Sequence, residues 1–294
     1  MKAKIGELTS IRTGKLDANA ACPDGRYPFF TCSKKPLQIS TYSYDCECVL
    51  VAGNGDLNVK YYKGKFDAYQ RTYIIEDNSG GKLYMPFLYF FMEGYIDVLR
   101  KQAIGGVIKY IKLGNLTEAI IELPSYEEQK EVVEILDKLK GIIDNETQRI
   151  RKYDDLIKAR FVELFGNPVI NSKNLRTMAL KDVLRLKAGD FTAASDISDK
   201  LTETNKYPCF GGNGIRGYVT EYNQEGEYSL IGRQGALSGN VQFAKGKFRN
   251  TEHALLVVPM VEMNDIWLNQ LLINLDLKRY QTGAAQPGEL LPVK

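Results

Sequence analysis

Long polar side chains stand in glycine-rich turns at several points of the sequence, and they are of the types that read DNA bases. Arginine, lysine, asparagine and glutamine can hydrogen-bond to guanine and adenine edges, and glycine lets a backbone approach phosphates closely. For any single residue, a solvated loop explains the sequence equally well. Recurrence of these residues at matched positions in two parts of the chain favours a binding role. The candidate DNA-binding residues are Lys34, Lys35, Asn54, Gln70, Arg71, Asn213, Arg216, Arg233, Gln234, Asn250 and His253.

Residues that could carry catalysis or hold a metal are few, and they stand in the wrong context. Residues 212–217 match the G-x-G-x-x-G pattern of dinucleotide sites, but no buried strand precedes them and no helix is expected after them. The one histidine, His253, has no Cys or Ser neighbour arranged as a triad. Among five cysteines the only close pair, Cys46 and Cys48, is C-x-C rather than C-x-x-C. The sequence therefore predicts no catalytic residue, no metal and no cofactor.

The turns recur because two regions of the chain resemble one another. Tyr27-Pro28-Phe29-Phe30 returns as Tyr207-Pro208-Cys209-Phe210, and further segments match in the same order. Such self-similarity in the same order, with one two-residue insertion before the third pair of segments, is typical of a duplicated structural unit. The matched segments are 27–30 with 207–210, 47–51 with 227–231, 63–66 with 245–248, and 86–90 with 266–270.

Each matched region is predicted to form short strands separated by Gly and Asn turns, followed by a helix. The predicted strands are 49–52, 58–62 and 72–75 in the first region, and 228–231, 240–243 and 254–258 in the second. The predicted helices are 87–100 and 267–277. We therefore expect a mixed α/β (α+β) fold with two similar domains, residues 1–124 and 166–294, joined by a long helix over residues 125–165.

The joining helix has clear start and stop signals. Ser125 and Glu128 form a capping box, and Gly166 begins a Gly-Asn-Pro stop. Apolar residues between them follow the three-and-four spacing of a coiled coil, interrupted by Glu146 and Arg160. A helix packed on its own domain is the alternative, but roughly 40 residues at about 1.5 Å each exceed most globular helices. The predicted interface residues are Val132, Leu136, Leu139, Ile143, Ile150, Tyr153, Ile157 and Leu164.

Length and composition limit the remaining classes. A chain of 294 residues predicts about two domains, and 44% hydrophobic with 26% charged residues is typical of a globular protein. No apolar stretch is long enough to span a bilayer, so we expect a cytoplasmic protein without membrane contact. The net charge of +3 is too small to indicate nucleic-acid binding by itself.

Several motifs together resemble one known family, the specificity subunits of type I restriction-modification systems. Residues 112–116 lead into 120–124, residues 126–129 open the long helix, and residues 161–168 close it. Residues 286–288 are similar to the turn before the family's last strand. The resemblance covers the whole chain, and the helix start at 126–129 is its sharpest part.

This resemblance implies two target-recognition domains that each bind one half of a split site in double-stranded DNA. It implies as partners the adenine methyltransferase (modification) subunits, docked on the helices, and the restriction (motor-nuclease) subunit. Members of the family are non-catalytic. They carry a second strand and long helix after the second domain, whereas this sequence stops at Lys294. We therefore expect the apolar seam to be covered by a homodimer through the spacer helix or by methyltransferase subunits.

Two other functions remain open from the sequence. A coiled-coil scaffold that binds proteins without DNA specificity would use the same helix, and it would enrich no duplex from a random library. An enzyme in its own right would need a cofactor site and would bind S-adenosylmethionine or a nucleotide.

Overall fold

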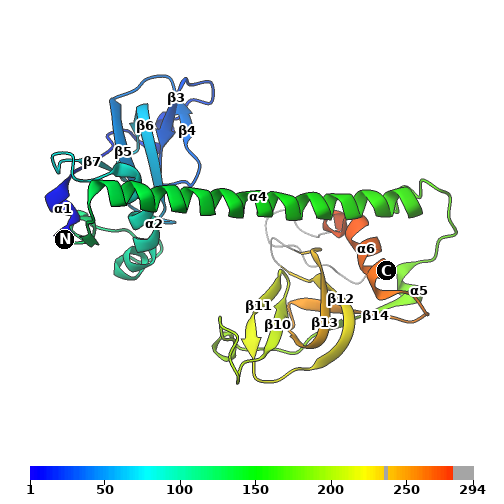
Figure 1. Ribbon diagram of the computed structural model, residues 1–294. Coiled ribbons are helices and arrows are strands. Elements are labelled where there is room, and N and C mark those ends of the chain that lie inside the picture. The colour runs from blue at the N-terminus through cyan, green and yellow to red at the C-terminus, as the bar shows by residue number, and fades with distance from the viewer. Residues whose placement is uncertain (235–237, 281–294) are drawn as a thin grey trace. The chain divides into compact units, whose positions relative to one another are not determined.

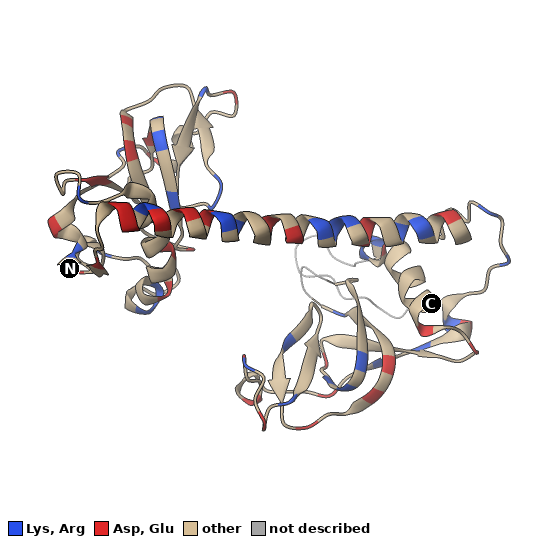
Figure 2. Cartoon of the chain, in the orientation of Figure 1, with Lys and Arg blue, Asp and Glu red and all other residues tan. Residues whose placement is uncertain are grey.

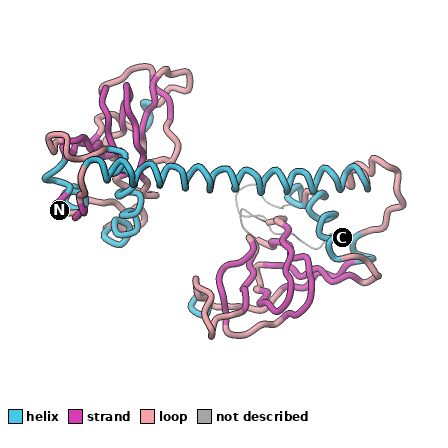
Figure 3. The backbone as a smooth tube through the Cα atoms, in the orientation of Figure 1, coloured by secondary structure: helices cyan, strands magenta, loops and turns pink. Residues whose placement is uncertain are grey.

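The computed structural model describes residues 1–234 and 238–280 and contains two compact units, Met1–Thr147 and Gln148–Lys294. Each unit has one six-stranded sheet, and the boundary between them falls inside one long helix (Figure 1). Helices and strands mix within each unit, as the backbone trace shows (Figure 3). The predicted mixed α/β fold, with two similar domains joined by a helix, is confirmed.

The first unit is built around the larger of its two sheets, which has six strands. Its strands are β1 (Lys2–Lys4), β2 (Thr9–Thr13), β3 (Tyr27–Phe30), β4 (Leu37–Ile39), β5 (Tyr44–Ala52), β6 (Val59–Ala68), β7 (Thr72–Asp77) and β8 (Ile120–Glu122). Its helices are α1 (Ile5–Leu8), η1 (Ala18–Ala20), α2 (Met85–Gln102) and α3 (Leu113–Thr117). The main sheet has the order β2-β7-β5-β6-β3-β4, and β1 pairs with β8. All neighbours are antiparallel except β3 and β6.

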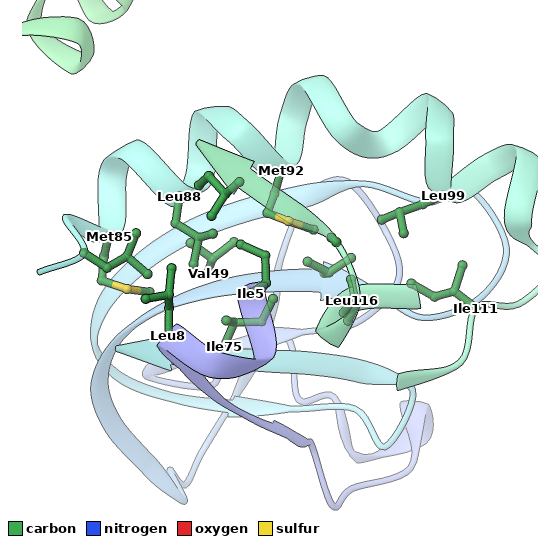
Figure 4. Close-up of a cluster of buried hydrophobic side chains, with 14 of the residues drawn as sticks. Ile5, Leu8, Val49, Ile75, Met85, Leu88, Met92, Leu99, Ile111 and Leu116 are labelled. Carbon is green, nitrogen blue, oxygen red and sulfur yellow. The ribbon is translucent and has the colours of Figure 1, made fainter. Parts of the chain in front are cut away.

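Helix α2 holds the core of the first unit against this sheet. Leu88, Met92 and Leu99 recur at helical spacing and are fully buried. They join one cluster with Ile5 of α1 and Val49 of β5 (Figure 4). Complete burial of one such side chain contributes about 1.5–3 kcal/mol relative to exposure. The core therefore lies under α2, and the polar loops between strands stay outside it.

The second unit repeats this plan. Its strands are β9 (Leu184–Ala188), β10 (Tyr207–Gly211), β11 (Gly214–Val219), β12 (Gln224–Gly232), β13 (Val241–Asn250) and β14 (Ala254–Pro259). Its shorter helices are α5 (Leu180–Val183), η2 (Ala194–Asp196), α6 (Asp265–Asn274) and η3 (Leu277–Tyr280). The sheet order β9-β14-β12-β13-β10-β11 matches that of the first unit strand for strand.

The match extends to strand direction and to side chains. The parallel pair recurs, as β3 with β6 and as β10 with β13. The ring centroids of Tyr27 and Tyr42 lie 4.9 Å apart, and those of Tyr207 and Tyr222 lie 5.0 Å apart, both with rings tilted by 57°. Identical topology with matched ring geometry confirms the internal repeat that the sequence predicted.

Some elements differ in length from the prediction. β5 and β6 are longer than expected because residues 44–51 pair with residues 59–66, even where charged residues such as Glu47 and Lys63 face each other. The helix predicted over 267–277 ends at Asn274, because Asp276 takes a left-handed conformation with φ of 49°. The expected turn at 286–288 lies outside the described residues.

Helix α4 (Tyr126–Phe165) starts where the sequence predicted. The Ser125 hydroxyl accepts from the Glu128 N–H at 3.3 Å, and the Glu128 carboxylate accepts from the Ser125 N–H at 2.8 Å. Gln129 is fully buried next to this cap. Its amide donates to the carbonyls of Lys82 and Pro124, at 2.8 and 3.0 Å, and its Oε1 accepts from the Tyr84 N–H at 2.8 Å. Gln129 thus fixes the start of α4 to the first unit.

The other end of α4 packs on the second unit. Phe161 is buried, and its ring centroid lies 6.3 Å from that of Trp267 on α6, while the Phe165 ring lies 6.1 Å from it. Gly166 follows with φ of 81°, the left-handed turn that commonly ends a helix. Among the described residues, no helix combines the length and apolar character that a membrane crossing requires.

Candidate nucleic-acid interface

The five candidate residues of the first unit lie on three loops. Lys34 and Lys35 are on the β3–β4 loop, Asn54 follows β5, and Gln70 and Arg71 form the β6–β7 turn. A hollow of about 670 Å³ is lined by residues from all three loops. All five side chains except the half-buried Asn54 are exposed. The structure therefore brings together loops that are distant in the sequence.

Backbone contacts hold these loops to one another. The Arg71 carbonyl accepts from the Gly53 N–H at 2.7 Å and from the Cys32 thiol at 3.5 Å. A Cβ at Gly53 would lie 2.4 Å from that carbonyl oxygen, so only glycine fits here. Lys34 forms an exposed ion pair with Asp56, with 3.5 Å between nitrogen and oxygen. The Arg71 backbone is thus anchored while its guanidinium faces solvent.

In the second unit, one hairpin carries two candidates. Asn213 lies in the β10–β11 turn and Arg216 on β11, and both are exposed. A Cβ at Gly211 would lie 2.4 Å from the Arg216 Cδ, so the arginine stem packs directly over this glycine. The Asn240 amide donates to the Asn213 Oδ1 at 3.4 Å. The hairpin tip is therefore held near the start of β13.

The remaining candidates of the second unit contact each other. Arg233 and Gln234 follow β12, and His253 lies in the β13–β14 turn. The Arg233 N–H donates to the His253 carbonyl at 2.9 Å, and the Gln234 Oε1 lies 3.3 Å from the His253 Nδ1. The His253 Nε2 lies 3.2 Å from the Glu252 carboxylate. This group occupies the same topological position as the Gly53–Arg71 contact of the first unit.

Asn250 differs from the expectation. It is the last residue of β13 and is fully buried, with both side-chain polar atoms unpaired among the described residues. Its N–H donates to the Asn223 Oδ1 at 2.7 Å, and its carbonyl accepts from the Asn223 amide at 2.9 Å. With no exposed surface, the Asn250 side chain does not face a ligand. Its polar type suggested a loop residue, but it is the last residue of β13, and successive side chains of a strand point to opposite faces of the sheet.

Two residues that the sequence interpretation did not name as candidates contact the β3–β4 loop, which lines this hollow. Asn58 and Lys60, at the start of β6, bond to the β3–β4 loop. Burial lowers the pKa of Lys60 to about 8. The polar alternation Asn58-x-Lys60 directly after a glycine turn could have indicated them. Ile108, from the segment between α2 and α3, also lines the hollow, and no pattern in the sequence pointed to it.

Charge is spread over both units rather than gathered in one patch (Figure 2). Acidic residues cluster at the first turn of α4, where the carboxylates of Glu127 and Glu128 interact favourably with the positive end of the helix dipole (Figure 2). In the part of the chain that the structure describes, no group of three or more His, Cys, Asp or Glu residues could hold a metal ion. The candidate loops offer hydrogen-bonding groups and single cations.

The predicted helix interface forms an exposed apolar stripe along α4. Of its eight residues only Leu136 is half-buried; the others range from Val132, 38% exposed, to Ile143, 65% exposed. Ile135, Ile142 and Leu156, which the prediction did not include, are exposed beside them. A stripe this apolar is unusual on a solvated surface.

The first part of the chain matches a known protein family. Residues 1–152 match the family described as the type I restriction modification DNA specificity domain. The match covers more than half of the 294 residues, and the chain belongs to this family.

Two curated relatives are specificity subunits from Escherichia coli. The EcoDI subunit is 41% identical over 155 residues, which cover 53% of this chain and 34% of that protein. The EcoprrI subunit is 32% identical over 215 residues, covering 69% of this chain and 53% of that protein. The chain thus spans about half or less of the relatives it matches.

A solved structure shows the same fold. The crystal structure of the type I restriction-modification S subunit from M. genitalium aligns with 94% of this chain and 77% of its own, with a TM-score of 0.57. Because the two sequences are 18% identical, this likeness concerns the fold alone.

Proposed function

We propose that this chain recognises specific sequences in double-stranded DNA as a specificity component of a type I restriction-modification assembly. Residues 1–124 and 166–294 are the two target-recognition domains of this proposal, and residues 125–165 are the spacer helix. One observation carries it: two sheets of the same strand order present polar loops at the same positions, but with different residues. Such a pair of modules suits a bipartite site whose halves differ in sequence.

Binding and positioning, rather than catalysis, is the role we assign to the chain. The names of its relatives describe specificity subunits. Arg71 and Arg216 present guanidinium forks that match guanine edges, and Asn54 and Gln234 present amides that match adenine. In this proposal the chemistry belongs to methyltransferase and restriction subunits, which the chain places on DNA.

Enrichment from a random duplex library tests the proposal against the scaffold alternative. We expect the full chain, alone or with methyltransferase subunits, to enrich a split sequence. Lys34→Ala should weaken binding, whereas Lys2→Ala should not. The two lysines are a matched pair, because each side chain is 73% exposed and each has one ion pair, at 3.5 and 3.3 Å. Enrichment of no sequence under either condition would favour a protein-binding scaffold.

The apolar stripe of α4 supports a helical partner in the same proposal. Covering several hundred Å² at about 25 cal/mol per Å² is worth on the order of 10 kcal/mol before association costs. We expect Leu136→Asp with Ile143→Asp to abolish self-association or methyltransferase docking in sedimentation experiments. Lys138→Asp with Asn145→Asp, at the same seven-residue spacing on another face, should leave association intact. Equal behaviour of both double variants would contradict a helical interface.

A further inference from the structure

The start of β6 carries two polar side chains on the same side of the strand. Asn58 precedes β6 and Lys60 is its second residue, so a period of two points both toward the β3–β4 loop. Both are half-buried, unlike the exposed Lys34 and Lys35 on the loop itself. Their position differs from that of an ordinary solvated lysine.

Their hydrogen bonds join two of the candidate DNA-binding loops. The Asn58 amide donates to the carbonyls of Cys32 and Asp56, each at 2.8 Å. The Lys60 ammonium donates to the Thr31 carbonyl at 3.4 Å and to the Asn58 Oδ1. Together they connect the base of the β3–β4 loop with the turn that precedes β6.

This connection continues to the third loop. The Cys32 thiol, two residues before Lys34, donates to the Arg71 carbonyl at 3.5 Å. The same carbonyl accepts from the Gly53 N–H, next to Asn54. The side chains of Lys60 and Asn58 are therefore the centre of a network that spans all three loops.

The second unit has uncharged residues, Asn240 and Gln242, at the positions that correspond to Asn58 and Lys60. Asn240 stands at the place of Asn58, and its amide reaches across to Asn213 on the β10–β11 hairpin at 3.4 Å. Gln242 stands at the place of Lys60, and its Oε1 would lie 3.2 Å from a Cβ at Gly214 of that hairpin. The start of β13 thus lies against the β10–β11 hairpin, as the start of β6 lies against the β3–β4 loop.

Lys60 itself is poorly placed to read DNA. Its two hydrogen-bond acceptors, the Thr31 carbonyl and the Asn58 Oδ1, are protein atoms. An ammonium group kept partly from water is best satisfied by fixed carbonyl and amide oxygens. Its role is consequently to orient its neighbours rather than to contact a ligand.

We propose that Lys60 is a positioning residue of the first unit, which holds the Thr31–Lys35 loop against the Gly53–Asn58 turn and so sets the orientation of Lys34 and Asn54 for base contact. The inference rests on the proposed DNA recognition for its last step, but the loop contact itself does not. In the second unit, the uncharged Gln242 has the corresponding role.

Alkylation of Cys32 tests the loop contact without DNA. Peptide mass spectrometry of the full chain gives the modification rate of Cys32, with the half-buried Cys46 on β5 as an internal reference. Lys60→Met removes the donors but keeps the stem, and should raise the Cys32 rate about tenfold relative to Cys46. Lys60→Arg, which keeps donors, should stay within about twofold of the original chain.

The second unit supplies a matched control, because Gln242→Met removes the counterpart and should leave the Cys32 rate unchanged. Lys60→Gln introduces the residue that the second unit uses, and it covers the case in which Lys60→Met does not fold. Unchanged Cys32 reactivity in every folded Lys60 variant would overturn the proposal.

A base-by-base binding profile tests the effect on recognition. Lys60→Met should flatten the base preference in one half of the site and leave the other half and non-specific duplex binding unchanged. Gln242→Met should affect only the other half. A uniform loss of affinity for all duplexes would overturn the positioning role and make Lys60 a phosphate contact. If the unaltered chain shows no preference at all, the proposed function fails, while the Cys32 measurement still decides the loop contact.

Discussion

The two units share a scaffold but differ at their loops. Lys65 of the first unit places its Nζ 4.7 Å from the Tyr42 ring centroid, and Lys247 of the second does the same to Tyr222 at 4.8 Å. The Phe30–Phe66 and Phe210–Phe248 ring pairs are likewise 5.5 Å apart in both units. At the loops, by contrast, Arg71 is replaced by His253. Packing contacts have stayed constant where they determine the sheet, while exposed positions have diverged.

One contrast shows how the scaffold tolerates change. In the first unit the Ala68 N–H donates to the Asp67 carboxylate at 3.0 Å, and the Ser43 hydroxyl supports that carboxylate at 2.8 Å. In the second unit Asn223 stands at the place of Ser43, and its Oδ1 accepts directly from the N–H of Asn250. A buried backbone donor must be satisfied, but the residue that satisfies it can change. The topology constrains hydrogen bonds more strongly than residue identity.

The largest expected effect tests whether the two cores are equivalent. Leu88 and Leu268 occupy matched positions on α2 and α6 and are at most 2% exposed. Each change to alanine should lower the free energy of unfolding by about 2–5 kcal/mol, because it leaves a cavity. Chemical denaturation followed by circular dichroism measures it. Val98→Ala and Ile266→Ala, at exposed positions of the same helices, should stay within about 0.5 kcal/mol. An insensitive Leu268→Ala would show that the second core is organised differently.

A matched pair of glycines sharpens the comparison further. A Cβ at Gly14 would lie 2.2 Å from the Ala68 carbonyl oxygen, and one at Gly189 would lie 2.2 Å from that of Asn250. Because the obstacle is backbone in both cases, we expect each change to alanine to cost about 1–3 kcal/mol of unfolding free energy. At Gly141 on α4, a Cβ would meet no described atom within 4 Å apart from the helix's own neighbouring backbone, so Gly141→Ala should instead stabilise slightly. A loss in one unit alone would break the proposed equivalence.

Changes in the loops, unlike changes in the two cores, should have different effects in the two units. Each should alter only its own half of the recognised sequence. Arg71→Ala and His253→Ala alter counterpart positions, and each should relax preference in one half-site by about 1–3 kcal/mol per lost base contact. Binding profiles over all single-base variants of the enriched site measure the change in base preference in each half-site. If either variant lowers affinity evenly over both halves, that residue contacts phosphate or maintains the fold.

The smallest effect concerns Lys60, whose counterpart Gln242 does not titrate. Burial lowers the folded-state pKa of Lys60 from 10.5 to about 8, so between these values the unfolded chain holds more protons. The free energy of unfolding of the unaltered chain should therefore rise with pH across this range, relative to Lys60→Met. Denaturant titrations between pH 7 and 9.5 measure the difference. Parallel pH profiles for the two chains would show that Lys60 is solvated.

Features that depend on local sequence were predictable. Ser125 and Glu128 cap α4 as expected, because a capping box needs only four consecutive residues. The repeat was also readable, since matched segments must adopt matched strands. Strand lengths were less predictable, because Glu47 and Lys63 interrupt the apolar pattern of their own strands. Their ion pair joins β5 to β6 and forms only in the folded sheet.

What the sequence by itself determined is the duplicated mixed fold, the long capped helix and the set of polar turns, all of which follow from periodicity and from glycine placement. Only the tertiary structure decided which polar residues meet. It buried Asn250 at a strand end, drew Lys60 under the Thr31–Lys35 loop, and fixed Gln129 against Lys82. Hydrogen bonds between residues far apart along the chain depend on how strands are ordered in the sheet, and no local pattern records that order.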